Sequence, residues 1–295
     1  MGGVSDGAGN SVWAAFDGRT FRLRMGLRPL DPAAWTTPPA SPRLVGELDR
    51  KARLLAERPA EVLATPPESD APAAELLDLL VAHLAKDHAE RYRRDGQAVV
   101  VDGVRRVETV GSDLHPLDVA GRLVAEDWCL VAPGPPPVMA AATLCSPNRW
   151  RLADKLGRDV ATVHDPVPGY RATLGAPVDR LLTSHSSPSW RRNWSIQSSP
   201  ALFQPFPEGP ARPAIPDEVW VRSEMETFVH LPRTRWWVFG IRTDVEPLAT
   251  LRGNPALASK VRTAVDSVDP DTAAYKDLAH WRDDLSQWLA GVASV

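Results

Sequence analysis

One histidine stands in a segment whose prolines should hold it at a fixed angle. His164 lies in the segment Thr162–Tyr170, just before Pro166 and Pro168, and we expect a stiff, extended loop here. A rigidly held imidazole suits an axial ligand of haem iron, because the ring must approach the metal along one direction. The same ring could instead cap a turn or bond to Asp165. His164 is therefore a candidate metal ligand with a structural alternative.

Two arginines lie between tryptophans in the segment Pro188–Trp194. Arg191 and Arg192 follow Trp190, and Asn193 separates them from Trp194. Guanidinium groups bind anions through paired hydrogen bonds, and indole rings can cover an apolar plate. Together these groups suit a porphyrin with its propionates, although arginines stacked on surface tryptophans would give the same pattern.

Charged residues alternate along the segment Val221–His230. Side chains of an extended strand point alternately to its two faces, so one face carries Arg222, Glu224, Glu226 and His230. If this face lines a pocket, Glu224 and Glu226 could bind a cationic amine or relay protons to bound oxygen, which makes them the candidate catalytic residues. If it faces water, the segment is an ordinary two-sided strand.

Several common catalytic motifs are missing from the sequence. None of the seven histidines stands in HExxH or another close metal-ligand spacing, which disfavours a zinc hydrolase. No GxSxG segment and no glycine-rich dinucleotide or P-loop turn occurs, which argues against an α/β-hydrolase and against NAD or ATP binding by those routes. Cys129 and Cys145 lie in apolar runs expected to be strands, so neither is an obvious thiolate ligand of haem.

The composition is that of an ordinary globular chain. Its 295 residues are 43% hydrophobic and 24% charged, and the formal net charge of -3 does not suggest a nucleic-acid or membrane partner. With two cysteines, no signal-peptide pattern and no long apolar run, we expect a cytoplasmic protein. Residues 1–12 are expected to form a flexible tail, and the sequence leaves open whether the chain forms a homo-oligomer.

The elements that must position the candidate residues follow from the apolar patterns. Two hairpins are expected, one turning at Asp102-Gly103 and one between the runs Glu218–His230 and Arg235–Thr243. Helices are expected over Pro42–Glu57, Ala73–Arg93, Pro116–Ala125, from Ser146-Pro147 to Gly157, and after Asn254-Pro255 and Asp269-Pro270. Hairpins between two groups of helices predict an α+β fold around a mostly antiparallel sheet.

An ordered set of short motifs resembles one protein family. The set comprises Gly26–Leu30, Glu126–Leu130, Ser146–Trp150 with Lys155–Gly157, His164 with Pro166–Pro168, Arg192–Ser195, Arg222 with Glu224, Thr227 and Leu231-Pro232, and Tyr275-Lys276. In this order and over nearly the whole chain, they resemble the haem-dependent oxidative N-demethylase alpha-subunit-like family.

The resemblance implies a fold, a cofactor and an activity. It implies a PAS-like antiparallel sheet wrapped by helices, in a single haem-binding domain over residues 13–295, with b-type haem in the pocket. It implies oxygen-dependent oxidation of a small or medium amine, with electrons from separate reductase subunits that carry flavin and iron–sulfur groups. Carried over by position, the resemblance implies haem contacts at His164, Arg192, Asn193 and Trp194. It also implies that Arg222 and Glu224 line the pocket, where Arg222 would be a further cofactor contact.

The strand motif departs from the family pattern. Glu226, Phe228 and His230 stand where the family usually has Gln, Leu and Arg, which changes the charge and shape of one pocket wall. The substrate is therefore expected to differ from a simple dialkylamine. Three hypotheses follow: an amine-oxidising haem enzyme of the monooxygenase type, a non-catalytic PAS-like haem or ligand sensor, and a structural module without cofactor.

Overall fold

The computed structural model describes residues 11–184, 187–209 and 212–294. Residues 1–10 of the expected tail lie outside this range. The prediction was wrong for the last two tail residues, because Ser11 and Val12 begin the 3-10 helix η1 (Val12–Ala15). The Ser11 side chain accepts a hydrogen bond from the Trp13 amide, and Val12 is only 1% exposed, so burial of an apolar side chain holds this segment.

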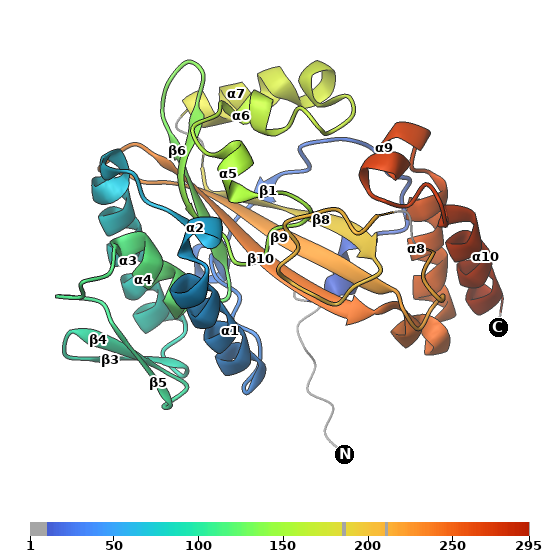
Figure 1. Ribbon diagram of the computed structural model, residues 1–295. Helices are drawn as coiled ribbons and strands as arrows, with labels where there is room; N and C mark the ends of the chain where they lie inside the picture. The colour runs from blue at the N-terminus through green and yellow to red at the C-terminus, as the bar shows by residue number, and fades with distance from the viewer. Residues whose placement is uncertain (1–10, 185–186, 210–211, 295) are drawn as a thin grey trace.

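A seven-stranded antiparallel sheet forms the centre of the molecule (Figure 1). The strand order is β1-β8-β9-β10-β6-β7-β2. The strands are β1 (Arg28–Pro29), β2 (Leu63–Ala64), β6 (Asp127–Ala132), β7 (Val138–Thr143), β8 (Ser189–Gln197), β9 (Trp220–His230) and β10 (Trp237–Pro247). Sheet and helices together confirm the α+β prediction, and the PAS-like character of the sheet stays a prediction.

The long central hairpin is the one that the alternating pattern predicts. β9 and β10 pair over their whole lengths, from Trp220 opposite Pro247 to His230 opposite Trp237. Gly240 of β10 is required by packing, because a Cβ atom there would lie 2.6 Å from both the Thr227 hydroxyl and the Trp128 ring. The Trp128 ring of the adjacent strand β6 can therefore lie over β10 only because residue 240 has no side chain.

A second, three-stranded sheet follows the first long helix. It consists of β3 (Tyr92–Asp95), β4 (Ala98–Val101) and β5 (Arg105–Glu108). The predicted Asp102-Gly103 turn is confirmed, with φ of 48° and 72° at its two residues, as a tight hairpin requires. The prediction of a helix up to Arg93 was wrong. The helix ends at Asp87, because the buried Tyr92 pairs with Val101 instead.

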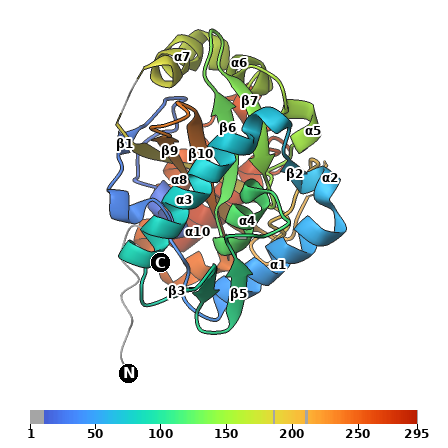
Figure 2. The same cartoon turned by 90° about the vertical axis from the view of Figure 1, so that its left-hand side faces the viewer.

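Helices near the N-terminus cover part of one sheet face. They are α1 (Arg43–Glu57), α3 (Asp70–Asp87) and α4 (Pro116–Leu123). Figure 2 shows α3 crossing in front of the strands. Their apolar stripes pack against Trp128, Leu130, Met225 and Val238 of the sheet, and this forms the largest core of the described residues.

The C-terminal helices pack beside the far ends of β8 and β9. They are α8 (Pro255–Asp266), α9 (Pro270–Tyr275) and α10 (Arg282–Ala293), at the right of Figure 1. The predicted starts of α8 and α9 are confirmed, because the side chains of Asn254 and Asp269 accept hydrogen bonds from the amides of Leu257 and Thr272. Their core includes Ile196 and Val221.

A run of short helices covers the opposite face, at the top of Figure 1. It contains α5 (Leu152–Lys155), α6 (Val160–Val163), the π-helix η4 (Arg171–Gly175) and α7 (Ala176–Thr183). The predicted helix start at Ser146-Pro147 was wrong. The Ser146 amide donates to Asp127 at 2.6 Å and its carbonyl accepts from Arg222 at 2.5 Å, so buried charges of the sheet hold this segment out of a helix.

The remaining short elements connect these layers. They are α2 (Pro59–Val62), η2 (Pro32–Ala34), η3 (Pro67–Ser69) and η5 (Leu248–Gly253). No helix in the described ranges is both long enough and apolar enough to span a bilayer.

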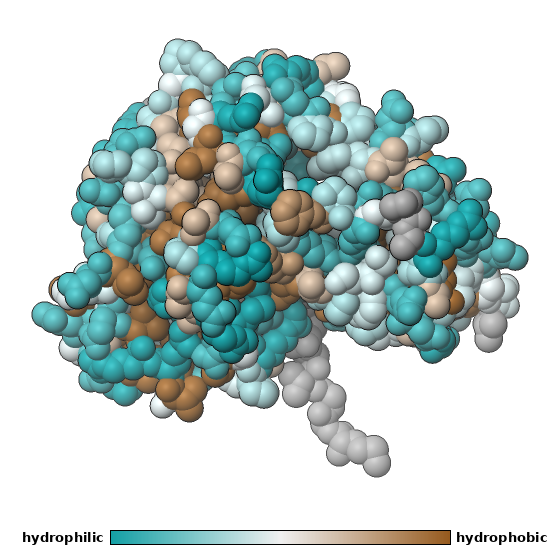
Figure 3. All heavy atoms as spheres, viewed as in Figure 1, coloured by the Kyte–Doolittle hydropathy of each residue, from teal (hydrophilic) through white to brown (hydrophobic). Residues whose placement is uncertain are grey.

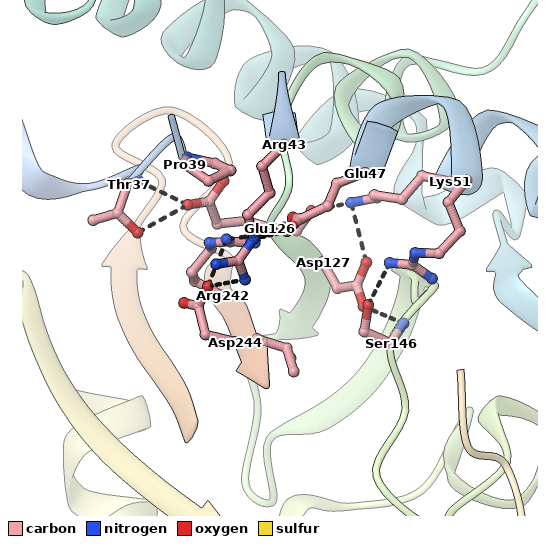
Figure 4. Close-up of polar contacts among 12 residues, drawn as sticks. Thr37, Pro39, Arg43, Glu47, Lys51, Glu126, Asp127, Ser146, Arg242 and Asp244 are labelled. Atoms are coloured by element: carbon pink, nitrogen blue, oxygen red, sulfur yellow. Dashed lines mark hydrogen bonds and ion pairs between the residues drawn. The ribbon is translucent and has the colours of Figure 1, made fainter. Parts of the chain in front are cut away.

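Buried ion pairs attach α1 to the sheet beside β10 and β6 (Figure 4). Arg242 of β10 donates to Glu47 of α1 at 2.6 Å and to Asp244 at 2.8 Å, and Arg43 contacts both carboxylates. We call these four residues the α1 charge cluster. Burial acts to raise the pKa of Glu47, but the charges and hydrogen bonds of Arg242 and Arg43 outweigh it and lower the pKa overall.

Candidate functional site

The alternating charges of β9 lie opposite polar residues of β8. In the register of this strand pair, Arg191 faces Glu226, and Asn193 faces Glu224. Arg222 lies on the same face of β9, two residues before Glu224. These five residues form what we call the β8–β9 polar face. The predicted sharing of one face by Arg222, Glu224 and Glu226 agrees with this register.

Glu226 is a buried carboxylic acid paired with one arginine. It is 7% exposed, and its Oε2 lies 2.7 Å from Nε of Arg191. Burial raises the pKa of Glu226 to about 7, with Glu224 adding to the rise, and the Arg191 charge only partly opposes it. The group can therefore both hold and release a proton near neutral pH, which a general acid or base requires.

Glu224 is held by two hydrogen bonds. Nε of Arg222 donates to its Oε1 at 2.9 Å, and the Asn193 amide donates to its Oε2 at 3.3 Å. Asn193 also accepts a hydrogen bond from the Trp194 amide at 2.9 Å, which orients its side chain. This carboxylate is thus positioned more rigidly than that of Glu226.

Arg222 is fully buried, and protein groups occupy its donors. Besides Glu224, it donates to the carbonyls of Leu202 at 3.1 Å and Ser146 at 2.5 Å. Its exposed fraction is 0%, so a bound molecule could reach it only after a rearrangement. In this conformation Arg222 orients Glu224 and does not offer the direct cofactor contact that the sequence suggested.

Two of the candidate cofactor residues lie on the other face of the sheet. Arg192 and Trp194 alternate with Arg191 and Asn193 along β8, so the four consecutive residues divide between both faces. Arg192 donates to Ser223 at 3.1 Å, and Trp194 packs on Phe16 with 5.1 Å between ring centroids. One molecule on the β8–β9 polar face therefore cannot contact all four side chains by that face.

His164 lies in the layer of short helices that covers the polar face. The extended loop predicted here was wrong: His164 ends α6 and lies in a series of turns, with Val167 donating to its carbonyl at 2.9 Å. Its ring stacks on Tyr170, with 4.5 Å between centroids and 7° between planes. The ring is therefore held firmly, although by stacking and not by an extended backbone.

The tautomer of His164 follows from one hydrogen bond. Nδ1 lies 2.8 Å from the Val160 carbonyl, which can only accept, so Nδ1 carries the proton. Nε2 then keeps its lone pair, and no described residue donates to it. Burial lowers the pKa of His164, and the charge of Arg191 contributes to the lowering. The neutral, singly protonated form is the one that binds metals.

Apolar side chains extend the polar face toward His164. Phe228 and Phe239 lie side by side on β9 and β10, with 5.0 Å between ring centroids. Phe228 packs against the apolar cluster that contains Val160 of α6. Phe239 and Val163 of α6 pack against a second cluster, which includes Cys129 and Ile241. The sheet thus offers an apolar surface beneath α6 that continues into the charged groups of Arg191 and Glu226.

Lys276 lies beside β8, and the sequence alone predicted no role for it. It is 7% exposed, and its Nζ donates to the Trp194 carbonyl at 2.7 Å. Burial lowers its pKa to about 8, against the field of Glu224. The motif Tyr275-Lys276 was the only signal of it in the sequence. Tyr170 was likewise missed, since its role depends on stacking with His164.

Both cysteines are unpaired and buried. Burial raises the pKa of both thiols, that of Cys145 to about 12, so neither is a thiolate near neutral pH. This agrees with the expectation that neither cysteine is an obvious thiolate ligand.

The arrangement is that of an α+β protein with a held histidine beside a charged face, in which burial raises the pKa of Glu226 to about 7. The sequence model of the family described as haem-dependent oxidative N-demethylase, alpha subunit-like, matches residues 26–286. The match spans most of the 295 residues, so the chain belongs to this family. By its description, the family consists of subunits related to a haem-dependent oxidative enzyme.

The residues of the site fit a haem group. A histidine with a free Nε2 and an acceptor at Nδ1 is the donor that haem iron takes in many proteins. The apolar rings of Phe228 and Phe239 suit contact with the porphyrin plane. Arg191, whose side chain is 26% exposed, suits a hydrogen bond to a haem propionate. The buried thiols offer no competing ligand.

Proposed function

We propose that the chain binds haem b through His164 and oxidises an amine with molecular oxygen, in the manner of a monooxygenase. The observation that supports this most directly is the hydrogen bond from Nδ1 of His164 to the Val160 carbonyl, which directs the metal-binding nitrogen away from its own helix. Family membership supplies the identity of the cofactor. When bound, haem would supply the iron at which oxygen is reduced.

The carboxylates of the polar face would transfer protons and orient the substrate in this reaction. Glu226, with a pKa of about 7, can take a proton from a bound alkylammonium and pass it on to the oxygen that is being reduced. Glu224 cannot move as freely, because Arg222 and Asn193 hold it. We assign Glu226 as the proton-transferring residue and Glu224 as the carboxylate that orients the amine.

Electrons would come from separate chains. The family description names an alpha subunit, which supports a system of several subunits. We expect a reductase carrying flavin and iron–sulfur groups to deliver the electrons, as the resemblance implies. We also infer a cytoplasmic location, which the two unpaired cysteines support.

Replacing the proposed ligand tests the haem site. His164→Ala should lower haem affinity at least tenfold and change the ferric absorption spectrum, since the iron loses its protein ligand. Affinity is measured by hemin titration at the Soret band, and folding by thermal unfolding. His280→Ala is the matched control, because His280 is exposed. Full haem content with an unchanged ferric spectrum in His164→Ala would remove the ligand assignment.

A haem sensor is the second candidate, and spectroscopy separates the two. Addition of an amine should shift the Soret band of an enzyme, whereas a sensor should respond only to diatomic gases. The pKa of Glu226 favours the enzyme, because a sensor of a neutral gas has no need of a carboxylic acid that titrates near neutral pH.

A further inference from the structure

Lys276 is a buried ammonium without a carboxylate partner. Among the described residues no carboxylate oxygen lies within 4.0 Å of its Nζ. An ammonium has three donors, and one of them binds the Trp194 carbonyl. The rings of Trp194 and Phe21 lie 4.6 and 5.5 Å from Nζ and contribute cation–π contacts. Neutral groups alone therefore surround a charge that is costly to bury.

The nearest carboxylates already belong to other cations. Glu226 lies 2.7 Å from Arg191, and Glu224 lies 2.9 Å from Arg222. Both act on Lys276 only through their longer-range fields. When Glu226 is ionised, the two carboxylates balance Arg191 and Arg222, and Lys276 remains as one excess positive charge.

Arg149 does not change this balance. It acts on Lys276 as a further positive charge, but Nε of Arg149 lies 3.1 Å from Asp277 and it has Glu208 at 3.6 Å. Its own partners therefore compensate it. The backbone also links the two cations, since Arg149 donates to the Lys276 carbonyl at 3.3 Å.

We propose that Lys276 binds a carboxylate of the molecule held at the β8–β9 polar face, either a propionate of the haem or a carboxylate carried by the amine substrate. This rests on the proposed function. One excess positive charge matches a monoanion, and the two remaining donors of the ammonium can bind its oxygens. A simple dialkylammonium, by contrast, would add a second unpaired cation to the site.

The test compares three lysine variants in the full chain. Lys276→Met removes the charge at nearly constant volume, Lys276→Arg keeps it, and Lys86→Met is the control, since that side chain is 79% exposed. Each is titrated with hemin, and each haem-loaded protein is then titrated with dimethylamine and with N-methylglycine at the Soret band.

Each outcome decides the proposal. If the propionate is the source, Lys276→Met should bind hemin at least tenfold more weakly, with recovery in Lys276→Arg. If the substrate is the source, hemin affinity should hold while affinity for N-methylglycine drops at least tenfold and that for dimethylamine does not. Unchanged affinities for all three ligands, in a Lys276→Met protein that unfolds at the wild-type temperature, would overturn the proposal.

Failure of the proposed function would look different. If wild-type protein takes up no hemin, the haem assignment fails, and the lysine is then tested on haem-free protein. A rise in unfolding temperature with N-methylglycine, present in wild type and Lys276→Arg and lost in Lys276→Met, would support carboxylate binding alone. No rise in wild type would end that proposal too.

Discussion

Two groups of buried charges lie on this sheet, and they differ in how well they are paired. In the α1 charge cluster each guanidinium contacts two carboxylates, and the pKa of Glu47 is lowered while that of Arg242 is raised. On the β8–β9 polar face the shifts are reversed, with the pKa of Glu226 raised and that of the adjoining Lys276 lowered.

The direction of these shifts separates structure from function. Well-paired groups favour their charged forms, and in the α1 charge cluster the pairing holds α1 to β10. Groups whose burial is not compensated favour their neutral forms and titrate near neutral pH, which is typical of binding and catalytic sites. Figure 3 shows the outside of the molecule, where hydrophilic residues cover most of the short-helix layer and of the C-terminal helices.

The largest expected effect comes from breaking the well-paired cluster. Arg242→Met should lower the free energy of unfolding by about 3–5 kcal/mol, because it removes the buried cation that Glu47 and Asp244 share and leaves them only the half-exposed Arg43. Chemical denaturation measures this value. Arg262→Met, which breaks only an exposed pair with Asp266, should cost about 1 kcal/mol or less. Equal losses would contradict the structural role of the cluster.

A smaller effect is expected from Glu226, and it depends on pH. Because the folded pKa of about 7 lies above the ordinary 4.5, the folded state keeps a proton that the unfolded state loses between these values. Stability should therefore fall as pH rises from 4.5 to 7, by on the order of 3 kcal/mol, and stay level above 7.

Glu226→Gln should remove this pH dependence. The difference in unfolding free energy between variant and wild type is measured from pH 4 to pH 8, so that other titrating groups cancel. A difference that does not change across this range would mean that the carboxyl of Glu226 titrates normally, and the contrast with Glu47 would disappear.

The smallest effect is expected at the arginine that pairs with Glu226 on the polar face. Arg191→Met should weaken hemin binding several-fold and raise the pKa of Glu226 further, since Arg191 is its partner. Arg192→Met should leave hemin affinity within about twofold, because Arg192 lies on the opposite face. Hemin titration of both variants measures this, and equal losses would show that the cofactor reaches both faces of β8.

The strand pattern predicted more of the site than the motifs did. The period of two in β9 placed Glu224 and Glu226 on one face, because a strand in a sheet has only two ways to direct a side chain. The same rule applied to β8 would have separated Arg191 from Arg192, which the motif had joined. Consecutive residues of a strand point to opposite faces of the sheet, so a continuous motif in a strand cannot line a single surface.

Long-range packing explains what the sequence could not predict. Lys276 reaches Trp194 across 82 residues, because the start of α10 and the core around Leu278 bring the end of α9 to β8. The turn at His164 depends on stacking with Tyr170, whereas its prolines alone indicated an extended chain. Local signals such as Asn254 and Asp269 at helix starts were reliable, since their partners lie three residues away.

The outer edge of β8 has a consequence for association. β1 pairs only with Ser189 and Trp190, so the rest of that edge has no strand partner among the described residues. Open edges invite a strand from another molecule, and natural sheets often guard them with lysines. Lys276 occupies the Trp194 carbonyl, so a further strand could pair at this point of the edge only by displacing the lysine.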